Sequence, residues 1–456
     1  MTTQDASTHP SAEHAPWAPD RLSSKDIRFA TWIAFFAWVF AVYDFILFGT
    51  LLPEIGRHFG WNETEQAEIA TWVALGGAVI AFAIGPVVDR LGRRSGIVIT
   101  VGGAAICSLL TAIAGGWGKG AMIGIRSVAG LGYAEQTVNA TYLSELYAST
   151  DDPRLQRRKG FVYSLVQGGW PVGALLAAAL TAVLMPIIGW QGSFIFAALP
   201  SLVIAVLAMR LKESPQFELH RRIAGLRKEG GESRARALAD AHGVDYEQHR
   251  GAGIAAAFRG PSLRATLVLG GAFLLNWFAI QVFSVLGTTV ITQVHAVSFE
   301  NSLLILVLSN LVGYFGYLTH GWLGDRYGRR NVIAVGWMLG GVVFTLMLQA
   351  PDDFTTIVAL YSLGLFFLIG PYAAALFFIS ESFPTSIRAT AGALIGAMGP
   401  VGAILAGFGA TSVLSAGGSW HEAALWFGAL PCLLSGIVMW AARHVDPSSL
   451  GEGVSR

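Results

Sequence analysis

The sequence predicts an all-α membrane protein in which twelve transmembrane helices form two pseudo-symmetric six-helix bundles. Three observations support this fold class. Of the 456 residues, 54% are hydrophobic and only 13% are charged, whereas roughly 25% are charged in an ordinary soluble domain. Apolar stretches of about the length that crosses a bilayer recur along the chain. One ten-residue pattern also occurs twice, each time where a long apolar stretch ends.

Residues 1–28 are polar and rich in Pro, Ala and Ser, without an apolar core. We therefore expect a cytoplasmic N-terminal tail rather than a cleaved signal peptide. Residues 29–210 form the expected first bundle. Its six predicted spans lie near 29–52, 67–88, 96–117, 120–146, 160–184 and 189–210.

Residues 211–264 are the one long polar interruption, and we expect them to form a cytoplasmic central loop. The second bundle is expected at 265–443, followed by a cytoplasmic tail at 444–456. Its predicted spans lie near 265–292, 301–323, 331–350, 354–379, 388–414 and 422–442.

The distribution of basic residues predicts the orientation. With the N-terminus in the cytoplasm, every Lys and Arg lies on the cytoplasmic side except Arg57, Lys119 and Arg126. Because cytoplasmic loops carry the excess of basic residues, both termini are expected to face the cytoplasm. The membrane is expected to be the cell's inner or plasma membrane.

The repeated pattern is GPVVDRLGRR at residues 85–94 and GWLGDRYGRR at residues 321–330. Each copy lies in the cytoplasmic turn after the second helix of a half. Such a turn could simply use Gly to bend and Arg to anchor at anionic headgroups. Two copies at equivalent positions instead indicate duplication and a gating charge cluster. The expected gating residues are Asp89, Arg90, Arg93, Glu145, Asp325, Arg326, Arg329, Glu381 and Arg388.

These motifs resemble the major facilitator superfamily, whose mark is this cytoplasmic sequence. LKESPQF (residues 211–217) and SESFPTSIRATAGAL (residues 380–394) look like segments of its sugar porters and organic-acid symporters. YDFILFG (residues 43–49) and GWQGSFIFAALPSL (residues 189–202) are similar to proton-coupled carriers of metabolites, aromatic acids, sialic acid and lactate. The resemblance implies two rocking bundles with a central cavity lined by helices one, four, seven and ten.

Three charges lie deep inside predicted spans: Asp44, Arg126 and Glu135. Ionisable groups at such depth are costly and indicate function. At about 1.5 Å per residue, Asp44 lies roughly 12 Å and Arg126 roughly 10 Å from the outer helix ends, so the two can pair. Glu135 lies nine residues beyond Arg126, on the opposite helix face unless Gly130 and Gly132 bend the helix.

We hypothesise that Arg126 binds a substrate carboxylate through its guanidinium fork. Asp44, or alternatively Glu135, then takes up the driving proton. The structural alternative is a fixed ion pair that joins helices one and four. Neutral groups are expected to complete the substrate site, although any one of them can serve helix packing instead. These candidates are Gln167, Trp170, Asn276, Gln281, Asn310, Tyr361 and Tyr372, with Asn276 and Gln281 too far apart in register to share one stripe.

The sequence thus predicts a proton-coupled symporter for a small organic anion, a mono- or aromatic carboxylate, that works as a monomer in a lipid bilayer. The alternatives are a drug exporter, a carrier of neutral solutes such as sugars, or a sensor on a carrier fold. We find no nucleotide site and no hydrolase constellation, and we expect no enzyme activity, no cofactor, no metal and no nucleic-acid partner. Cys107 and Cys432 lie within apolar stretches, where packing is the simplest role.

Overall fold

The described part of the chain is helical. The computed structural model describes residues 17, 19, 22–114, 117–150, 152, 162, 165–242, 257–383 and 387–443, and no strand occurs among them. The helices up to residue 208 are α1 (Ser24–Phe59), α2 (Glu63–Leu91), α3 (Arg93–Ala114), α4 (Lys119–Val128), α5 (Leu131–Ala148) and α7 (Gly169–Ala208).

The later helices begin with two short polar ones, α8 (Pro215–Lys228) and α9 (Glu232–Ala241). A long apolar series follows. It comprises α10 (Pro261–Ala279), the π-helix η4 (Ile280–Val285), α11 (Gly287–His295), α12 (Phe299–Tyr327), α13 (Arg329–Leu348), α14 (Phe354–Ile369), α15 (Tyr372–Glu381), α16 (Arg388–Ser415), α17 (Trp420–Ala424), η5 (Leu425–Ala429) and α18 (Leu430–Trp440).

Local sequence sets several helix starts. Ser23 accepts a hydrogen bond from the backbone N–H of Asp26, and the Asp26 carboxylate bonds back to the Ser23 N–H. Asn62 and Glu65 form the same reciprocal cap at α2. Such capping boxes satisfy backbone donors that the first helical turn leaves unpaired.

Helix breaks account for most differences from the expected spans. The expected 120–146 helix is interrupted between α4 and α5, where Gly130 lies at the start of the second piece. The expected spans 160–184 and 189–210 are joined from residue 169 onward in α7, with a kink at Gly189, whose φ of 67° is non-helical. Residues 160, 161, 163 and 164 lie outside the described part of the chain. The expected 354–379 helix breaks between α14 and α15, at Gly370 and Pro371.

The repeated sequence pattern forms the same tight link in both places. Gly92 follows α2 with a φ of 101°, and Gly328 follows α12 with a φ of 88°. Positive φ is a region that glycine enters without steric cost. The next helix begins directly at Arg93 or Arg329, so each basic pair lies in the first turn of a helix.

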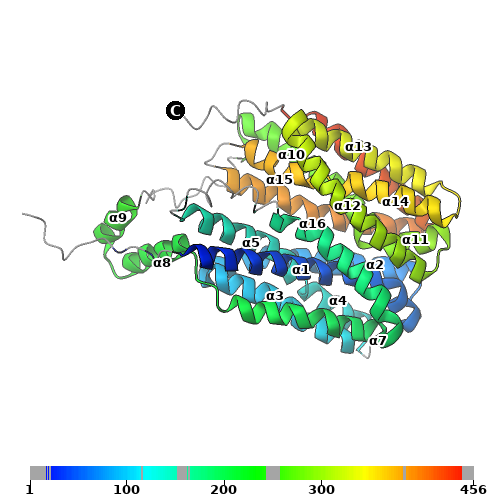
Figure 1. Cartoon of the computed structure of the whole chain (residues 1–456), viewed down its shortest axis with the longest axis horizontal. Helices are drawn as coiled ribbons and strands as arrows, with labels where there is room; N and C mark the ends of the chain where they lie inside the picture. The colour runs from blue at the N-terminus through cyan, green and yellow to red at the C-terminus, as the bar shows by residue number, and fades with distance from the viewer. Residues whose placement is uncertain are drawn as a thin grey trace, which may run out of the picture.

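Figure 1 shows two groups of long helices, with α1, α3, α5 and α7 on one side and α10, α12, α13 and α14 on the other. Helices α7 and α12 pack together across the two groups, as do α2 and α16. Helices α8 and α9 project beyond one end of the bundle. There Leu219, Ile223, Ala235 and Leu238 form a small apolar core of their own.

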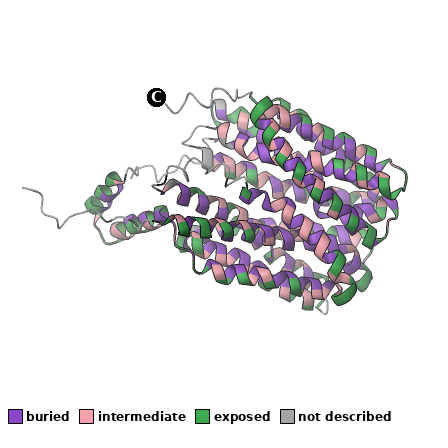
Figure 2. Cartoon of the chain, in the orientation of Figure 1, coloured by how far each residue is buried: buried purple, intermediate pink, exposed green. Residues whose placement is uncertain are grey.

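Ten helices of the described residues are long and apolar enough to cross a membrane. Exposed residues cover the outward faces of the bundle in Figure 2. Many of these are large and apolar, such as Val79, Ile187 and Trp426, with 59%, 74% and 61% of their surface exposed. A belt of this kind suits contact with lipid.

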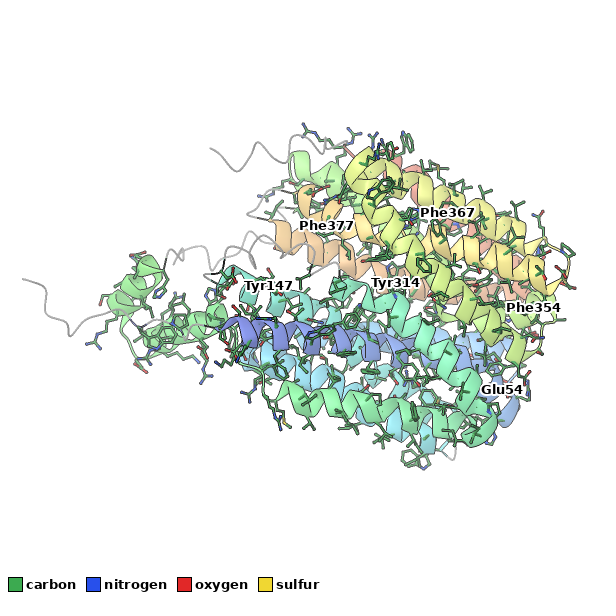
Figure 3. The ribbon with its side chains drawn as sticks, in the orientation of Figure 1. Glu54, Tyr147, Tyr314, Phe354, Phe367 and Phe377 are labelled. Carbon is green, nitrogen blue, oxygen red and sulfur yellow. The ribbon has the colours of Figure 1, made fainter. Side chains whose placement is uncertain are left out.

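The two ends of the bundle serve as reference points below. Tyr147 and Phe377 lie toward the end from which α8 and α9 project, which we call the proximal end (Figure 3). Glu54 and Phe354 lie toward the opposite, distal end. Thus α1 runs from the proximal to the distal end, because Ser24 precedes Glu54 in the same helix.

Candidate functional site

Asp44 on α1 and Arg126 on α4 form a buried ion pair. Arg126 Nη1 lies 3.3 Å from Asp44 Oδ1, and Nη2 lies 3.2 Å from Oδ2. Nη2 also donates to the Asp44 backbone oxygen at 3.1 Å. Only 3% of the Arg126 side chain and 5% of the Asp44 side chain are exposed. The guanidinium therefore grips the carboxylate through both terminal nitrogens, as a bidentate pair.

A third helix supports this pair. The Ser108 hydroxyl on α3 donates to Asp44 Oδ1, and Arg126 Nη1 lies 3.4 Å from the Ser108 oxygen. The guanidinium also lies 5.2 Å from the ring centroids of both Phe48 and Phe194. Arg126 Nε is buried without a hydrogen-bond partner among the described residues. The cation thus keeps one N–H unused in an aromatic, water-poor setting.

Glu135 on α5 is separate from that pair. The residue is completely buried. Among the described residues, neither of its carboxyl oxygens has a hydrogen-bond partner within normal geometry. Asn139, one turn further along, interacts with the carboxyl, although its amide nitrogen donates to the Ala34 backbone oxygen. A carboxylate charge left in this position would carry a large desolvation cost.

A cavity lies between the two helix groups, and no charged side chain occurs among the described residues that line it. Three tryptophans, two glutamines and two tyrosines supply most of its surface. Its lining residues are Trp38, Gln136, Gln167, Trp170, Trp277, Ile280, Tyr317, Ile369, Tyr372 and Leu376. They come from α1, α5, α7, α10, η4, α12, α14 and α15, apart from Gln167 just before α7.

Aromatic rings from both groups meet at this cavity. The Trp277 ring on α10 lies 5.5 Å from that of Tyr133 on α5 and 5.8 Å from that of Trp170 on α7. Phe45, the neighbour of Asp44 in sequence, packs against the same two rings of α5 and α7 at 5.9 and 6.1 Å. One aromatic cluster therefore links the cavity to the helix segment that carries the ion pair.

The structure divides the neutral residues that the sequence nominated. Gln167, Trp170 and Tyr372 line the cavity. Asn276 lies one layer behind it and accepts a 2.7 Å hydrogen bond from the Tyr372 hydroxyl. Gln281 is buried in η4 and is absent from the cavity lining.

Two other nominated residues bond to backbone within the second helix group. The Tyr361 hydroxyl donates to the Phe283 oxygen at 2.6 Å, and Asn310 Nδ2 donates to the Leu306 oxygen at 2.9 Å. Neither lines the cavity. Tyr361 therefore joins α14 to η4, whereas the Asn310 bond lies within α12.

Sequence reasoning missed Trp38, Gln136, Trp277 and Tyr317 in the cavity lining and Ser108 beside the ion pair. Gln136 lies three residues after Tyr133, whose ring contacts the cavity residue Trp277, so the two share a helix face, but the sequence alone does not identify that face as the inward one. Ser108 gave no signal, since a lone serine in an apolar run is common in membrane helices.

At the proximal end, the nominated charges form two ion pairs that are 236 positions apart in both partners. Arg93 Nη2 lies 3.3 Å from Glu145 Oε1, joining α3 to α5. Arg329 pairs with Glu381 and also lies 3.1 Å from Asp325, joining α13 to α15 and α12. Each pair therefore lies within one helix group.

The remaining nominated charges differ in their surroundings. Arg90 and Arg326 are exposed, and the Arg326 guanidinium lies 5.6 Å from the Trp322 ring centroid. The side chains of Asp89 and Arg388 lie outside the described part of the structure.

The central segment is attached to the first of these clusters. Glu213 Oε1 accepts a 2.9 Å hydrogen bond from the Arg93 backbone N–H, and both carboxylate oxygens lie 3.3 Å from the Arg94 N–H. A carboxylate at the N-terminus of α3 is favoured by unpaired backbone donors and by the helix dipole. Glu213 thus connects the start of the α8 segment to the repeated pattern.

At the distal end the two helix groups are joined through backbone contacts. The Thr288 hydroxyl on α11 donates to the Gly49 and Thr50 oxygens on α1, at 3.2 and 2.9 Å. A Cβ built on Gly49 would lie 2.1 Å from the Val285 oxygen. Glycine therefore allows α1 to approach η4 more closely than any other residue could.

Several transporters resemble this chain over most of its length. A putative niacin/nicotinamide transporter of Bacillus subtilis is 24% identical over 82% of this chain and 85% of that protein. The gentisate transporter of Corynebacterium glutamicum is 24% identical over 83% and 79%. The 4-hydroxybenzoate transporter of Pseudomonas putida is 23% identical over 88% and 90%.

Solved structures show the same fold. The D-xylose–proton symporter matches with a TM-score of 0.66 at 17% identity, covering 91% of this chain and 98% of that one. The inward-open xylose transporter of E. coli gives the same score over 93% and 99%. The family model described as Major Facilitator Superfamily matches residues 34–319 and 269–455. The chain therefore belongs to the Major Facilitator Superfamily and is a multi-pass membrane transporter.

Proposed function

We propose that the protein is a proton-coupled symporter that moves a small organic anion, a mono- or aromatic carboxylate, by alternating access. The observation that carries the proposal is the buried Arg126–Asp44 pair, whose helix segment is connected through Phe45 to the aromatic-lined cavity between the helix groups. The matched carriers of niacin, gentisate and 4-hydroxybenzoate all move small ring compounds, which supports this substrate class.

The proposed architecture has twelve spans. To the ten spanning helices we add one by dividing α7 at the Gly189 kink and one by joining α4 to α5. The proposed parts are the tails 1–28 and 444–456, the bundles 29–210 and 265–443, and the central loop 211–264. Residues 243–256 of that loop lie outside the described residues.

We propose that the protein lies in the cell's inner membrane, with the proximal end and both termini on the cytoplasmic side. The basic residues at that end, such as Arg93 and Arg329, support it through the positive-inside rule. One chain supplies both helix groups and the cavity between them, which supports function as a monomer.

In the proposed mechanism, the substrate carboxylate competes with Asp44 for the Arg126 guanidinium, whose fork fits a carboxylate. Once released from its cation, Asp44 takes a proton, because an isolated carboxylate charge in a low-dielectric interior is costly. Loading the anion and loading the proton thereby become one event. Glu135 is the alternative proton carrier.

Alternating access is proposed to use the contacts at both ends. The Thr288 contact and the close approach at Gly49 would hold the distal, outer end closed, as in an inward-facing state. The pairs Arg93–Glu145 and Arg329–Glu381 would brace each half while it rocks, together with Asp89, Arg90, Asp325, Arg326 and Arg388.

Uptake into proteoliposomes tests the proposal, with a panel of lactate, benzoates, sialic acid, dicarboxylates, betaine and hexoses. An inward proton gradient should accelerate accumulation of at least one carboxylate. Asp44→Asn and Arg126→Lys should each abolish uphill uptake while the protein remains in the membrane. Gradient-driven accumulation by both variants would rule out the scheme.

The neutral character of the described residues in the cavity lining favours a second candidate, a carrier of neutral solutes. In that case hexoses or another uncharged solute of the panel, rather than carboxylates, should be moved. Acceleration by an outward proton gradient would instead indicate an exporter that works by antiport.

A further inference from the structure

Two amide side chains in the cavity bond to each other and to no other described residue. Gln136 Nε2 on α5 donates to Gln167 Oε1, just before α7, at 2.9 Å. Both residues line the cavity. Only 4% of Gln167 is exposed, whereas Gln136 is partly exposed. The pair is therefore a built feature of the cavity wall rather than a surface contact.

Amide chemistry determines which donors and acceptors of Gln136 and Gln167 stay unused. A primary amide has one oxygen acceptor and an NH₂ donor, so one bond between two amides leaves an oxygen on one and an NH₂ on the other. Exchanging the oxygen and nitrogen positions of both side chains gives the same remainder. Gln136 and Gln167 thus offer one acceptor and at least one donor side by side.

A hydroxyl group complements that remainder, because it donates one hydrogen bond and accepts others. An ionised carboxylate can only accept, so it would leave the amide oxygen unpaired. The surrounding surface suits a flat ring, since Trp38, Trp170 and Trp277 all line the same cavity. Aromatic pairs prefer the edge and offset contacts that such walls provide.

Another polar group of the wall is already engaged. The Tyr372 hydroxyl already donates to Asn276 Oδ1 at 2.7 Å. The cation Arg126 is engaged by Asp44 and lies against Phe48 and Phe194. The amide pair is accordingly a part of the wall that still has a donor and an acceptor for a ring hydroxyl.

We propose that Gln136 and Gln167 form the subsite that recognises a hydroxyl group on the ring of the transported molecule. The inference rests on the proposed function and narrows its substrate class to hydroxylated aromatic carboxylates. When the bound ring lacks the hydroxyl, one donor and one acceptor of the amide pair have neither water nor ligand as a hydrogen-bond partner. The protein should therefore bind such a ring about tenfold or more weakly.

The test measures counterflow in proteoliposomes with the full-length chain, comparing benzoate with its 2-, 3- and 4-hydroxy derivatives. In the wild-type protein at least one hydroxy isomer should compete about tenfold better than benzoate. Gln136→Leu and Gln167→Leu should remove this preference, so that benzoate and its hydroxy derivatives compete equally well. Gln349→Leu, at an exposed glutamine outside the cavity, serves as the matched control.

A binding measurement separates this inference from the proposed function. Phenol and fluorobenzene carry no carboxylate, so calorimetry of the purified protein with these probes reports on the ring subsite alone. Phenol should bind more tightly than fluorobenzene to the wild type and equally to Gln136→Leu. If no carboxylate is transported but the wild type still prefers phenol and Gln136→Leu does not, the symporter proposal is overturned and the subsite is retained.

Two results overturn the subsite itself. One is that, for the wild-type protein, no hydroxybenzoate competes better than benzoate, or phenol binds no more tightly than fluorobenzene. The other is a pair of leucine variants that weaken the hydroxylated and unsubstituted rings by the same factor, as a purely structural amide bond would require.

Discussion

Arg126 holds Asp44 by three hydrogen bonds, two to the carboxylate and one to the backbone oxygen. The pair lies almost completely out of solvent. Attraction and desolvation nearly cancel in such a pair, so it contributes little net stability, whereas losing one partner strands the other charge. This asymmetry makes the pair suitable for a cycle in which one partner is exchanged.

The first prediction concerns the stability of charge-removing variants. Asp44→Asn should lower the free energy of unfolding by about 3–5 kcal/mol, because Arg126 then remains as an uncompensated buried charge. Arg126→Gln should behave similarly, and the double variant should recover much of the loss. Thermal unfolding in detergent measures all three proteins. A double variant less stable than either single one would contradict this account.

The second prediction separates the two buried carboxyl groups. Glu135→Gln should retain proton-driven uptake, since among the described residues no cation that a substrate could displace contacts Glu135. Asp44→Asn should lose it. Uptake with and without an imposed proton gradient provides the measurement. The reverse result would assign the proton to Glu135.

The third prediction tests whether the close approach of α1 to η4 closes the distal end of the cavity. Gly49→Ala should separate these two helices, because the new methyl group meets the Val285 oxygen and such overpacking costs about 1–3 kcal/mol. Gly124→Ala is the control, since no atom lies within 4 Å of a Cβ there.

The readout is a cysteine at cavity position Ile280, in a protein whose Cys107 and Cys432 are replaced by alanine. An impermeant thiol reagent applied from outside should label Ile280→Cys faster when Gly49→Ala is present. Equal labelling in Gly49→Ala and Gly124→Ala would show that this approach does not close the distal end.

The fourth prediction concerns the attachment of the central segment. Glu213→Gln should loosen α8, because a neutral amide loses the charge-assisted bonds to the N-terminus of α3, an effect of about 1–2 kcal/mol. Trypsin should then cut faster after Arg221 and Arg222. Glu229→Gln, at an exposed glutamate that ends α8, should leave the rate unchanged.

Sequence reasoning reached the paired charges because their positions follow from simple rules. The 236-residue offset placed Glu145 and Glu381 at matching points, and the structure contains Arg93–Glu145 and Arg329–Glu381. Depth along two helices likewise brought Asp44 and Arg126 to one level. Rise per residue and repetition are properties that a single sequence displays directly.

The rotation of each helix about its axis was harder to predict. In lipid, both the outward and inward faces of a helix are apolar, so hydrophobicity does not identify the inward face. For that reason Trp277 and Gln136 were missed, while Tyr361 and Asn310 were nominated although they bond to backbone behind the cavity. Such assignments require neighbouring helices in position.

The meeting of Trp277 with Tyr133 and Trp170 has a consequence for how tightly this carrier can hold its cargo. When the cavity is empty, the protein's own rings already satisfy one another, so an arriving ring replaces existing contacts instead of creating entirely new ones. The replacement of these contacts reduces the net free energy that the protein gains when a ring binds.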